Sequence, residues 1–214
     1  MKDIAIYGAG GFGKEVACLI KVINQKEPTW NLVGFFDDGK EKGIKVSHYG
    51  NVLGGLAELN EWDTPIDIAI AIGSSIIVQK IVQSVSNPLV SFPNIIHPSF
   101  YMADKESFII GKGNIIQRNC SVSCDVSIGD FNVFNGAVSM GHDDKIGSFN
   151  TFMPGVRVSG EVTVGNENFF GVGSIILQQI CIGTNIRLGA GSVLMTKPKD
   201  GKLYIGNPAK RMEL

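Results

Sequence analysis

The chain has 214 residues, of which 44% are hydrophobic and 18% charged, a composition that excludes a disordered or highly charged protein. Its 19 basic and 20 acidic residues leave a net charge of -1, which argues against a nucleic-acid-binding surface. No apolar stretch approaches the roughly 20 residues of a transmembrane helix, so we expect a cytoplasmic protein with neither nucleic-acid nor membrane partners.

Residues 1–97 predict a small α/β domain, a Rossmann-like unit that binds a nucleotide. A buried strand at 4–7 leads into Gly8-x-Gly10-x-x-Gly13, and a helix with apolar spacing follows. Glycines at such a turn let the backbone approach a phosphate, although they could also serve only to pack helix on strand. The flanking strand and helix favour a substrate-binding role for Gly8, Gly10 and Gly13.

Polar residues also follow the next two predicted strands. Asp37 and Asp38 end the second strand, near the spacing of a ribose-binding carboxylate, and Gly73 and Ser74 end the third. With a fourth apolar segment, the domain has room for about one mononucleotide-binding half. This disfavours NAD and favours a nucleoside diphosphate, such as the handle of an activated sugar.

The second predicted domain, residues 98–214, contains a six-residue repeat. Every sixth residue from Ile110 to Leu194 is apolar, and glycine and asparagine recur every 18 residues. Six residues therefore make one side of a triangular coil, and we expect a parallel β-helix of about five coils. We also expect Gly and Asn where the backbone turns with positive φ. The apolar positions are Ile110, Ile116, Val122, Ile128, Phe134, Met140, Ile146, Phe152, Val158, Val164, Phe170, Ile176, Ile182, Leu188 and Leu194, and the others are Gly111, Gly129, Gly147, Gly165, Gly183, Asn114, Asn132, Asn150 and Asn168.

The whole chain resembles the left-handed β-helix hexapeptide acyltransferases. Within them it is similar to the branch that N-acetylates nucleotide-linked 4-amino sugars, whose relatives O-acetylate sialic acid. The resemblance implies a left-handed helix and a homotrimer with active sites at subunit interfaces. It also implies acetyl-CoA as a co-substrate and no tightly bound cofactor. The matching motifs are Gly8-x-Gly10-x-x-Gly13, Asp37-Asp38, Ile96-His97-Pro98-Ser99, Gly141-His142-Asp143, Pro154-Gly155, Gly189-Ala190-Gly191-Ser192-Val193 and Gly206-Asn207-Pro208-Ala209-Lys210.

His142 is the only histidine of the repeat, at a coil corner where Met140 already takes the inward position. A general base for acyl transfer needs a pKa near the working pH and a carboxylate that orients its ring. In the resembling family such a pair lies beside the attacking amine, and His142 with Asp143 or Asp144 matches it. The alternative is a surface histidine that is hydrogen-bonded at a turn.

Gly160 follows His142 by 18 residues, which places it at the same corner one coil along, about 4.8 Å away. A glycine there would admit the thioester, and its N–H could stabilise an oxyanion, as the family also implies. Gly173, Ala190 and Gly191 are small enough to line a pantetheine groove, and Lys197, Lys210 and Arg211 could meet the coenzyme phosphates. Some relatives carry a second histidine where this chain has Thr151.

The expected function is acetyl-CoA-dependent N-acetylation of the 4-amino group of a nucleotide-linked deoxy amino sugar, by direct transfer. O-acetylation of sialic acid and a non-catalytic scaffold of coils remain alternatives. One histidine in the repeat cannot supply the three zinc ligands of a carbonic anhydrase, so we expect no metal site. The four cysteines are expected to be reduced, mostly buried and without a catalytic role.

Overall fold

The computed structural model describes residues 1–213, so Leu214, the last residue of the second predicted domain, lies outside the described residues. The chain divides into two compact units, with the boundary between Pro98 and Ser99. Among the described residues, no helix has the length and apolar character needed to cross a bilayer.

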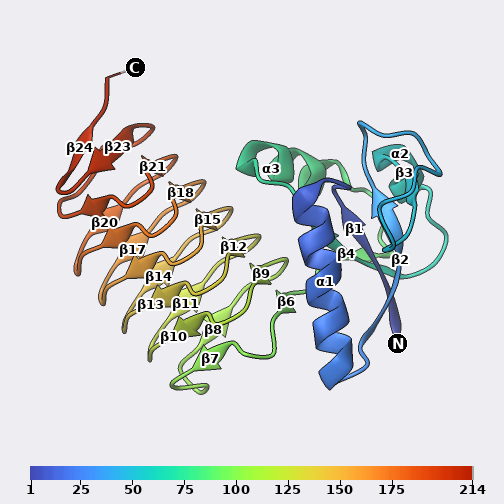
Figure 1. Ribbon diagram of the computed structural model, residues 1–214, viewed down its shortest axis with the longest axis horizontal. Helices are drawn as coiled ribbons and strands as arrows, with labels where there is room; N and C mark the ends of the chain where they lie inside the picture. The colour runs from blue at the N-terminus through green and yellow to red at the C-terminus, as the bar shows by residue number, and fades with distance from the viewer. Residues whose placement is uncertain (214) are drawn as a thin grey trace. The chain divides into compact units, whose positions relative to one another are not determined.

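The first unit is a parallel five-stranded sheet in the order β3-β2-β1-β4-β5, flanked by helices (Figure 1). From β1 the chain builds outward on one side to β2 and β3, then returns to place β4 on the other side of β1. The strand order therefore reverses between β1 and β4, the kind of position where α/β sheets bind ligands. The elements are β1 (Lys2–Tyr7), α1 (Gly11–Lys26), β2 (Trp30–Phe36), β3 (Val52–Gly54), α2 (Leu56–Asn60), β4 (Ile66–Ile70), α3 (Ser75–Ser84) and β5 (Val90–Ser91).

Two parts of this unit differ from the prediction. The structure adds the short elements β3 and α2, which were not predicted. The apolar segment at 89–96 is not one strand but two, β5 and β6 (Ile95–Ile96), separated around Pro93. Proline has no N–H to donate to a sheet, so it interrupts the run.

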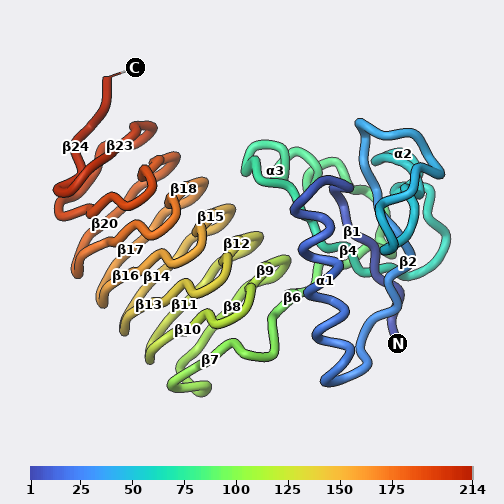
Figure 2. The backbone as a smooth tube through the Cα atoms, viewed as in Figure 1, coloured from blue at the N-terminus to red at the C-terminus, as the bar shows by residue number. Residues whose placement is uncertain are grey.

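The second unit is a β-solenoid in which the strands from β8 to β22 stack in parallel on strands 18 residues away (Figure 1, and as a tube in Figure 2). One face is β22-β19-β16-β13-β10-β7, the second is β20-β17-β14-β11-β8, and the third includes β23-β21-β18-β15-β12-β9 with β24 antiparallel to β23. The strands are β7 (Tyr101–Met102), β8 (Ile109–Ile110), β9 (Ile115–Ile116), β10 (Ser121–Val122), β11 (Ser127–Ile128), β12 (Val133–Phe134), β13 (Ser139–Met140), β14 (Lys145–Ile146), β15 (Thr151–Phe152), β16 (Arg157–Val158), β17 (Thr163–Val164), β18 (Phe169–Phe170), β19 (Ile175–Ile176), β20 (Cys181–Ile182), β21 (Arg187–Leu188), β22 (Val193–Leu194), β23 (Leu203–Gly206) and β24 (Ala209–Arg211).

The solenoid has more coils than the five predicted, because β7 already stacks on β10 ahead of the recognised repeat. The sequence pattern hides this coil, since Asp104 stands six residues before Ile110, where the repeat would require an apolar residue. At the other end, the C-terminal segment adds β23 to the stack by pairing with β21.

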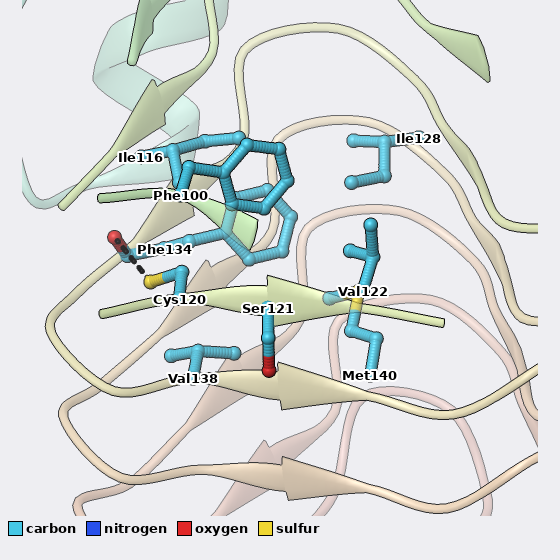
Figure 3. A pocket seen from close by; sticks show the side chains of 9 residues that line it. All are labelled: Phe100, Ile116, Cys120, Ser121, Val122, Ile128, Phe134, Val138 and Met140. Carbon is cyan, nitrogen blue, oxygen red and sulfur yellow. Dashed lines mark hydrogen bonds between the residues drawn. The ribbon is translucent and has the colours of Figure 1, made fainter. Parts of the chain in front are cut away.

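The interior follows the predicted hexad positions. Fourteen of the fifteen apolar residues are buried, and Ile110, in the first recognised hexad, is half-buried. Phe134, Phe152 and Phe170 stack face to face on successive coils, with ring centroids 4.9 and 4.6 Å apart. Figure 3 shows the first coils from close by, where nine side chains, including Phe100, Phe134 and Met140, line a gap of only about 10 Å³. A space of that size holds at most about one water molecule, so this gap is too small for a ligand.

The corner conformations correct the sequence-based expectation. Positive φ falls on every sixth residue, with values between 53° and 74°, but not on the Gly111 or Asn114 series. The Gly111 series is small for a different reason: a Cβ on Gly147 would lie 2.5 Å from the carbonyl oxygen of Gly165 on the next coil. The positive-φ residues are Gly113, Asn119, Asp125, Phe131, Ala137, Asp143, Phe149, Gly155, Glu161, Glu167, Gly173, Gln179, Asn185 and Gly191.

The asparagine series forms a buried ladder through one corner. Asn132 Oδ1 accepts the backbone N–H of Asn150, 18 residues on, at 2.9 Å. Asn132 Nδ2 donates to the carbonyl oxygen of Gly147, 15 residues on, at 2.9 Å. The same two bonds recur for Asn150 and Asn168. Asparagine is therefore selected as a side chain that both accepts and donates, which keeps a buried amide satisfied.

The cysteines are all free, but the expectation that most are buried was wrong. Only Cys120 is buried, Cys124 is half-buried, and Cys18 and Cys181 are exposed. Cys181 precedes the inward-facing Ile182 on its strand and so points outward, because successive strand residues alternate sides.

Candidate active site

The corner between β13 and β14 carries His142 and Asp143, both on the surface. Nδ1 of His142 lies 2.7 Å from Oδ2 of Asp143, and the two side chains are 54% and 56% exposed. Since a carboxylate only accepts hydrogen bonds, Nδ1 carries the proton, and a neutral ring then has Nε2 unprotonated. The pair thus presents a basic nitrogen at the surface of the solenoid.

The electrostatics of this corner raise the pKa of His142. The largest cause is the hydrogen bond to Asp143, followed among the raising effects by the charges of Asp143, Glu161 and Asp144, while partial desolvation opposes them. Each of these three carboxyl groups, when ionised, favours the imidazolium form, which a general base becomes during proton transfer. Asp143 is therefore placed to orient the ring and to stabilise it once it is charged.

Gly160 lies against the imidazole from the next coil. The backbone N–H of Glu161 donates to the carbonyl oxygen of His142 at 2.8 Å, which fixes the two coils in register. A Cβ on Gly160 would lie 2.5 Å from Nε2 of His142, so no other residue fits here without moving the ring. Among the described residues, the N–H of Gly160 donates no backbone hydrogen bond, which leaves it able to bind an incoming oxygen.

A surface depression of about 490 Å³ adjoins this pair on the side of β14 and β17. Its lining residues are Asp125, Asp143, Lys145, Glu161 and Thr163. Three of the five are acidic and follow one another by 18 residues, so they form one column at the corner. Sequence reasoning missed Asp125 and Glu161, although their spacing from Asp143 was a usable signal. Such a lining suits a cationic amine.

Asp144 does not pair with His142, which decides between the two predicted partners in favour of Asp143. Its side chain is fully buried, and Oδ1 accepts the backbone N–H of Val162 at 2.9 Å. Burial raises the pKa of Asp144 to about 6, against the lowering effect of backbone N–H groups and of His142. Oδ2 is buried and has no hydrogen-bond partner among the described residues.

The predicted coenzyme residues lie elsewhere on the same chain. Gly173 and Ala190 are exposed at the corner where β18 and β21 lead into β19 and β22, on the opposite edge of the face that ends at His142. A Cβ on Gly173 would meet nothing within 4 Å, so open space lies above it. Lys197 and Lys210 are exposed and follow the last full coil. One chain does not bring these residues to His142. Thr151 lies on β15, in another face.

In the first unit, the glycine-rich turn is tightly packed against the sheet. Gly8 has φ of 111°, and a Cβ there would lie 2.6 Å from the carbonyl oxygen of Ala71, just beyond β4. A Cβ on Gly13 would overlap the carbonyl oxygen of Gly8. These two glycines therefore let α1 start directly against β1. Gly10 is the N-cap of α1 and a Cβ on it would face open space, which leaves the helix N-terminus accessible.

The predicted acids after β2 hold this turn in place. Asp37 accepts the backbone N–H groups of Ala9 at 2.8 Å and Gly39 at 2.9 Å. Asp38 accepts the hydroxyl of Tyr7 at 2.5 Å and the N–H of Leu56 at 2.8 Å. Burial and the bond to Asp38 raise the pKa of Tyr7. Asp37 is half-buried beside the loop, whereas Asp38 joins β1 to the start of α2.

The third predicted segment begins α3. Ser74 is the N-cap of α3 but makes no side-chain capping bond, and a Cβ on Gly73 would face open space. The loop residue Ile72 approaches Gly8, at 3.1 Å from a Cβ placed there. The loops after β1, β2 and β4 therefore meet at the carboxyl edge of these three adjacent strands. The N-termini of α1 and α3 begin at this edge, and both are accessible to solvent. Helix N-termini attract anions such as phosphate.

Comparison with known proteins adds to this geometry. Residues 3–85 match the family model of the PglD N-terminal domain. Among curated protein sequences, none matches the chain. Among solved structures, the acetyltransferase domain of PglB from Neisseria gonorrhoeae FA1090, in complex with acetyl coenzyme A, is 30% identical with a TM-score of 0.88, over 99% of each chain. The chain belongs to the hexapeptide-repeat sugar N-acetyltransferases.

Two other members of this acetyltransferase family are similar over the full length. PerB from Caulobacter crescentus, in complex with CoA and GDP-perosamine, is 26% identical with a TM-score of 0.87, over 100% of this chain and 98% of that one. WeeI from Acinetobacter baumannii AYE is 26% identical with a TM-score of 0.87, over 99% of this chain and 100% of that one. The protein is accordingly an acetyl-CoA-dependent acetyltransferase.

Proposed function

We propose that this acetyltransferase transfers the acetyl group of acetyl-CoA directly to the 4-amino group of a nucleotide-linked deoxy amino sugar, with His142 as general base. The observation that carries the proposal is the Asp143–His142–Gly160 corner, where a carboxylate-bound imidazole places Nε2 against Gly160, whose backbone N–H donates no backbone hydrogen bond among the described residues. The complex of PerB with GDP-perosamine and CoA supports this substrate class.

In the proposed reaction the amine nitrogen attacks the thioester carbonyl carbon while Nε2 of His142 takes an amine proton. The carbonyl oxygen becomes an oxyanion, which the Gly160 N–H stabilises as a hydrogen-bond donor. Collapse breaks the C–S bond, and the imidazolium returns its proton to the thiolate of CoA. The products are an amide and free CoA. No enzyme nucleophile is needed, and Asp143 stabilises the charged ring between the two proton transfers.

The proposed binding site for the nucleotide is the carboxyl edge of the first unit. The open N-termini of α1 and α3, at Gly10 and Ser74, would receive the diphosphate, and Asp37 would accept a ribose hydroxyl. Replacing Gly10 by Val should raise the KM for the nucleotide sugar and leave the KM for acetyl-CoA unchanged. An equal rise of both KM values would contradict a separate nucleotide site.

We further propose a homotrimer of left-handed solenoids, with acetyl-CoA between neighbouring subunits. Gly173 and Ala190 lie at a different corner from His142, so a coenzyme that touches both sets would need two chains. Lys197 and Lys210 would then meet its phosphates. Light scattering should give the mass of three chains, and a monomer with full activity would contradict this arrangement.

The experiment that tests the proposal has two steps. A thermal-shift screen of UDP-, GDP-, dTDP- and CMP-linked amino sugars, with and without CoA, identifies the nucleotide that the protein binds. Initial rates with that sugar should then show a sequential pattern that requires both substrates before product release. A ping-pong pattern, or an acetylated protein that accumulates without acceptor, would contradict direct transfer.

A further inference from the structure

At the corner that contains Asp144, the equivalent residues of the other coils are apolar. The residues 18 positions before and after it are Val126 and Val162, and Ile180 follows one coil later, all of them buried. Asp144 is also fully buried, directly beneath the His142–Asp143 pair. A carboxyl in such a column is costly unless its polar atoms find partners. One of them, Oδ2, has none among the described residues.

The hexad register of the other two corners indicates which backbone atom to expect opposite Oδ2. Asp144 follows the positive-φ residue Asp143, just as Asn132 and Asn150 follow Phe131 and Phe149 in the asparagine ladder. In that ladder, one side-chain atom accepts the N–H of the residue 18 positions on, and Asp144 Oδ1 does the same with Val162. The other ladder atom, Nδ2, donates to the carbonyl oxygen 15 positions on.

The third corner of the solenoid shows the same relation with a different side chain. Cys120, at the equivalent hexad position, directs Sγ to the carbonyl oxygen of Asn135, 15 residues on, at 3.1 Å. Figure 3 shows this cysteine inside the corner, beside Phe134 and Val138. For Asp144, the carbonyl 15 residues on belongs to Ser159, which precedes Gly160. As a carboxylate Asp144 could only repel that oxygen, whereas as a carboxylic acid it could donate to it.

We propose that Asp144, in its protonated form, donates a hydrogen bond from Oδ2 to the carbonyl oxygen of Ser159 and thereby positions and polarises the Ser159–Gly160 peptide. This positioning role rests on the proposed function of the Gly160 N–H as oxyanion donor. A peptide whose carbonyl accepts a hydrogen bond is a stronger N–H donor, because hydrogen bonds in a chain reinforce one another. The direction in which burial moves the Asp144 pKa agrees with a proton held here.

The titratable groups around Asp144 come from three coils. Its ionisation is coupled to the imidazole and carboxylate of its own corner, and the neighbouring coils add further groups at the same edge. They are His142, Asp143 and Lys145 on its own coil, Cys124 and Asp125 on the coil before, and Glu161 on the coil after. A kinetic test must therefore include two uncharged replacements, since both remove the charge that Asp144 exerts on His142 and differ from each other in the hydrogen-bond donor.

The test measures kcat from pH 5.5 to 9 for the wild type, Asp144→Asn and Asp144→Val. Asn keeps a donor at every pH, so its kcat relative to wild type should rise as pH increases and Asp144 ionises. Val fills the column like its neighbours but has no donor, so its kcat should be about tenfold lower at the acid end. That deficit should shrink toward high pH, with the KM for the sugar unchanged. Ratios that stay flat with pH, or equal effects of Asn and Val, would overturn the proposal.

A matched control and a spectrum separate this inference from the proposed function. Asn132→Asp places the same carboxyl in the equivalent hexad position at another corner, where it faces Gly147, and its kcat ratio to wild type should not vary with pH. The infrared spectrum of the wild type near pH 5.5 should show a protonated carboxyl band that Asp144→Asn lacks. Absence of that band overturns the proposal even in an active enzyme. An enzyme without acetyl transfer that shows the band would contradict only the proposed function.

Discussion

Replacing Asp144 by Asn should stabilise the fold in a way that depends on pH. The Asp144 pKa rises from 3.8 to about 6 on folding, chiefly through burial. Because its folded pKa is the higher one, the stability that the protonated carboxyl contributes is fully present below pH 4 and is lost as pH rises through 6. A shift of about 2 units corresponds to about 3 kcal/mol. Asn does not titrate and should therefore gain up to about 3 kcal/mol over wild type at pH 8, relative to pH 4.

The assay is urea denaturation of wild type and Asp144→Asn at pH 4, 5, 6, 7 and 8, at one protein concentration. The two proteins share every other titratable group, so the difference between their unfolding free energies reports on Asp144 together with its coupling to His142 and Asp143. That difference should grow between pH 4 and 7 and then level off. A constant difference across this range would refute the reasoning, because it would mean that Asp144 has the same pKa in the folded and unfolded chain.

Three further predictions concern the core and the catalytic corner. Val164→Asp buries an unpaired charge inside the solenoid and should lower the free energy of unfolding by about 3–5 kcal/mol, seen as insoluble or unfolded protein. An unchanged melting temperature would show that Val164 does not face inward. Gly160→Ala should push the His142 ring aside and lower kcat roughly 100-fold. The control Gly136→Ala, whose Cβ would make only an ordinary 3.6 Å contact, should keep the wild-type kcat. Equal kcat values for the two variants would show that Gly160 is not needed to place the ring. Asp143→Asn should lower the His142 pKa, because the hydrogen bond from Asp143 is the main cause that raises it. The acid limb of kcat/KM against pH should therefore move to lower pH, and the maximum should fall. An acid limb that does not move would show that it does not report the ionisation of His142.

The sequence was sufficient to predict the solenoid, because its inward residues obey a period that each coil repeats. The corner conformations were not predictable from residue type. Phe131 and Glu161 take positive φ, which is unfavourable for a bulky side chain in isolation. Each is held by a backbone hydrogen bond to the coil before, from Phe131 N–H to Lys112 and from Glu161 N–H to His142. That contact between coils outweighs local preference.

The catalytic corner was predictable in outline, because His142 and Gly160 share a column that follows from the 18-residue period. The structure was needed to assign Asp143 as the histidine partner, since both Asp143 and Asp144 are near in sequence. Their roles differ because Asp143 turns outward at the positive-φ position and Asp144 turns inward at the next. The sequence does distinguish Asp144 in one respect, because the residues spaced from it by multiples of 18 are the apolar Val126, Val162 and Ile180.

The chemistry of the product distinguishes N-acetylation of a nucleotide-linked amino sugar from the alternatives. The protein is incubated with acetyl-CoA and the amino sugar that the binding screen identifies, and the product is examined by mass spectrometry before and after neutral hydroxylamine. We expect a sugar heavier by one acetyl group that survives hydroxylamine, because an amide is not cleaved. His142→Ala should form this product about 10²–10⁴ times more slowly. An acetylated sugar that hydroxylamine cleaves would be an ester and would contradict N-acetylation, as would the absence of any acetylated sugar.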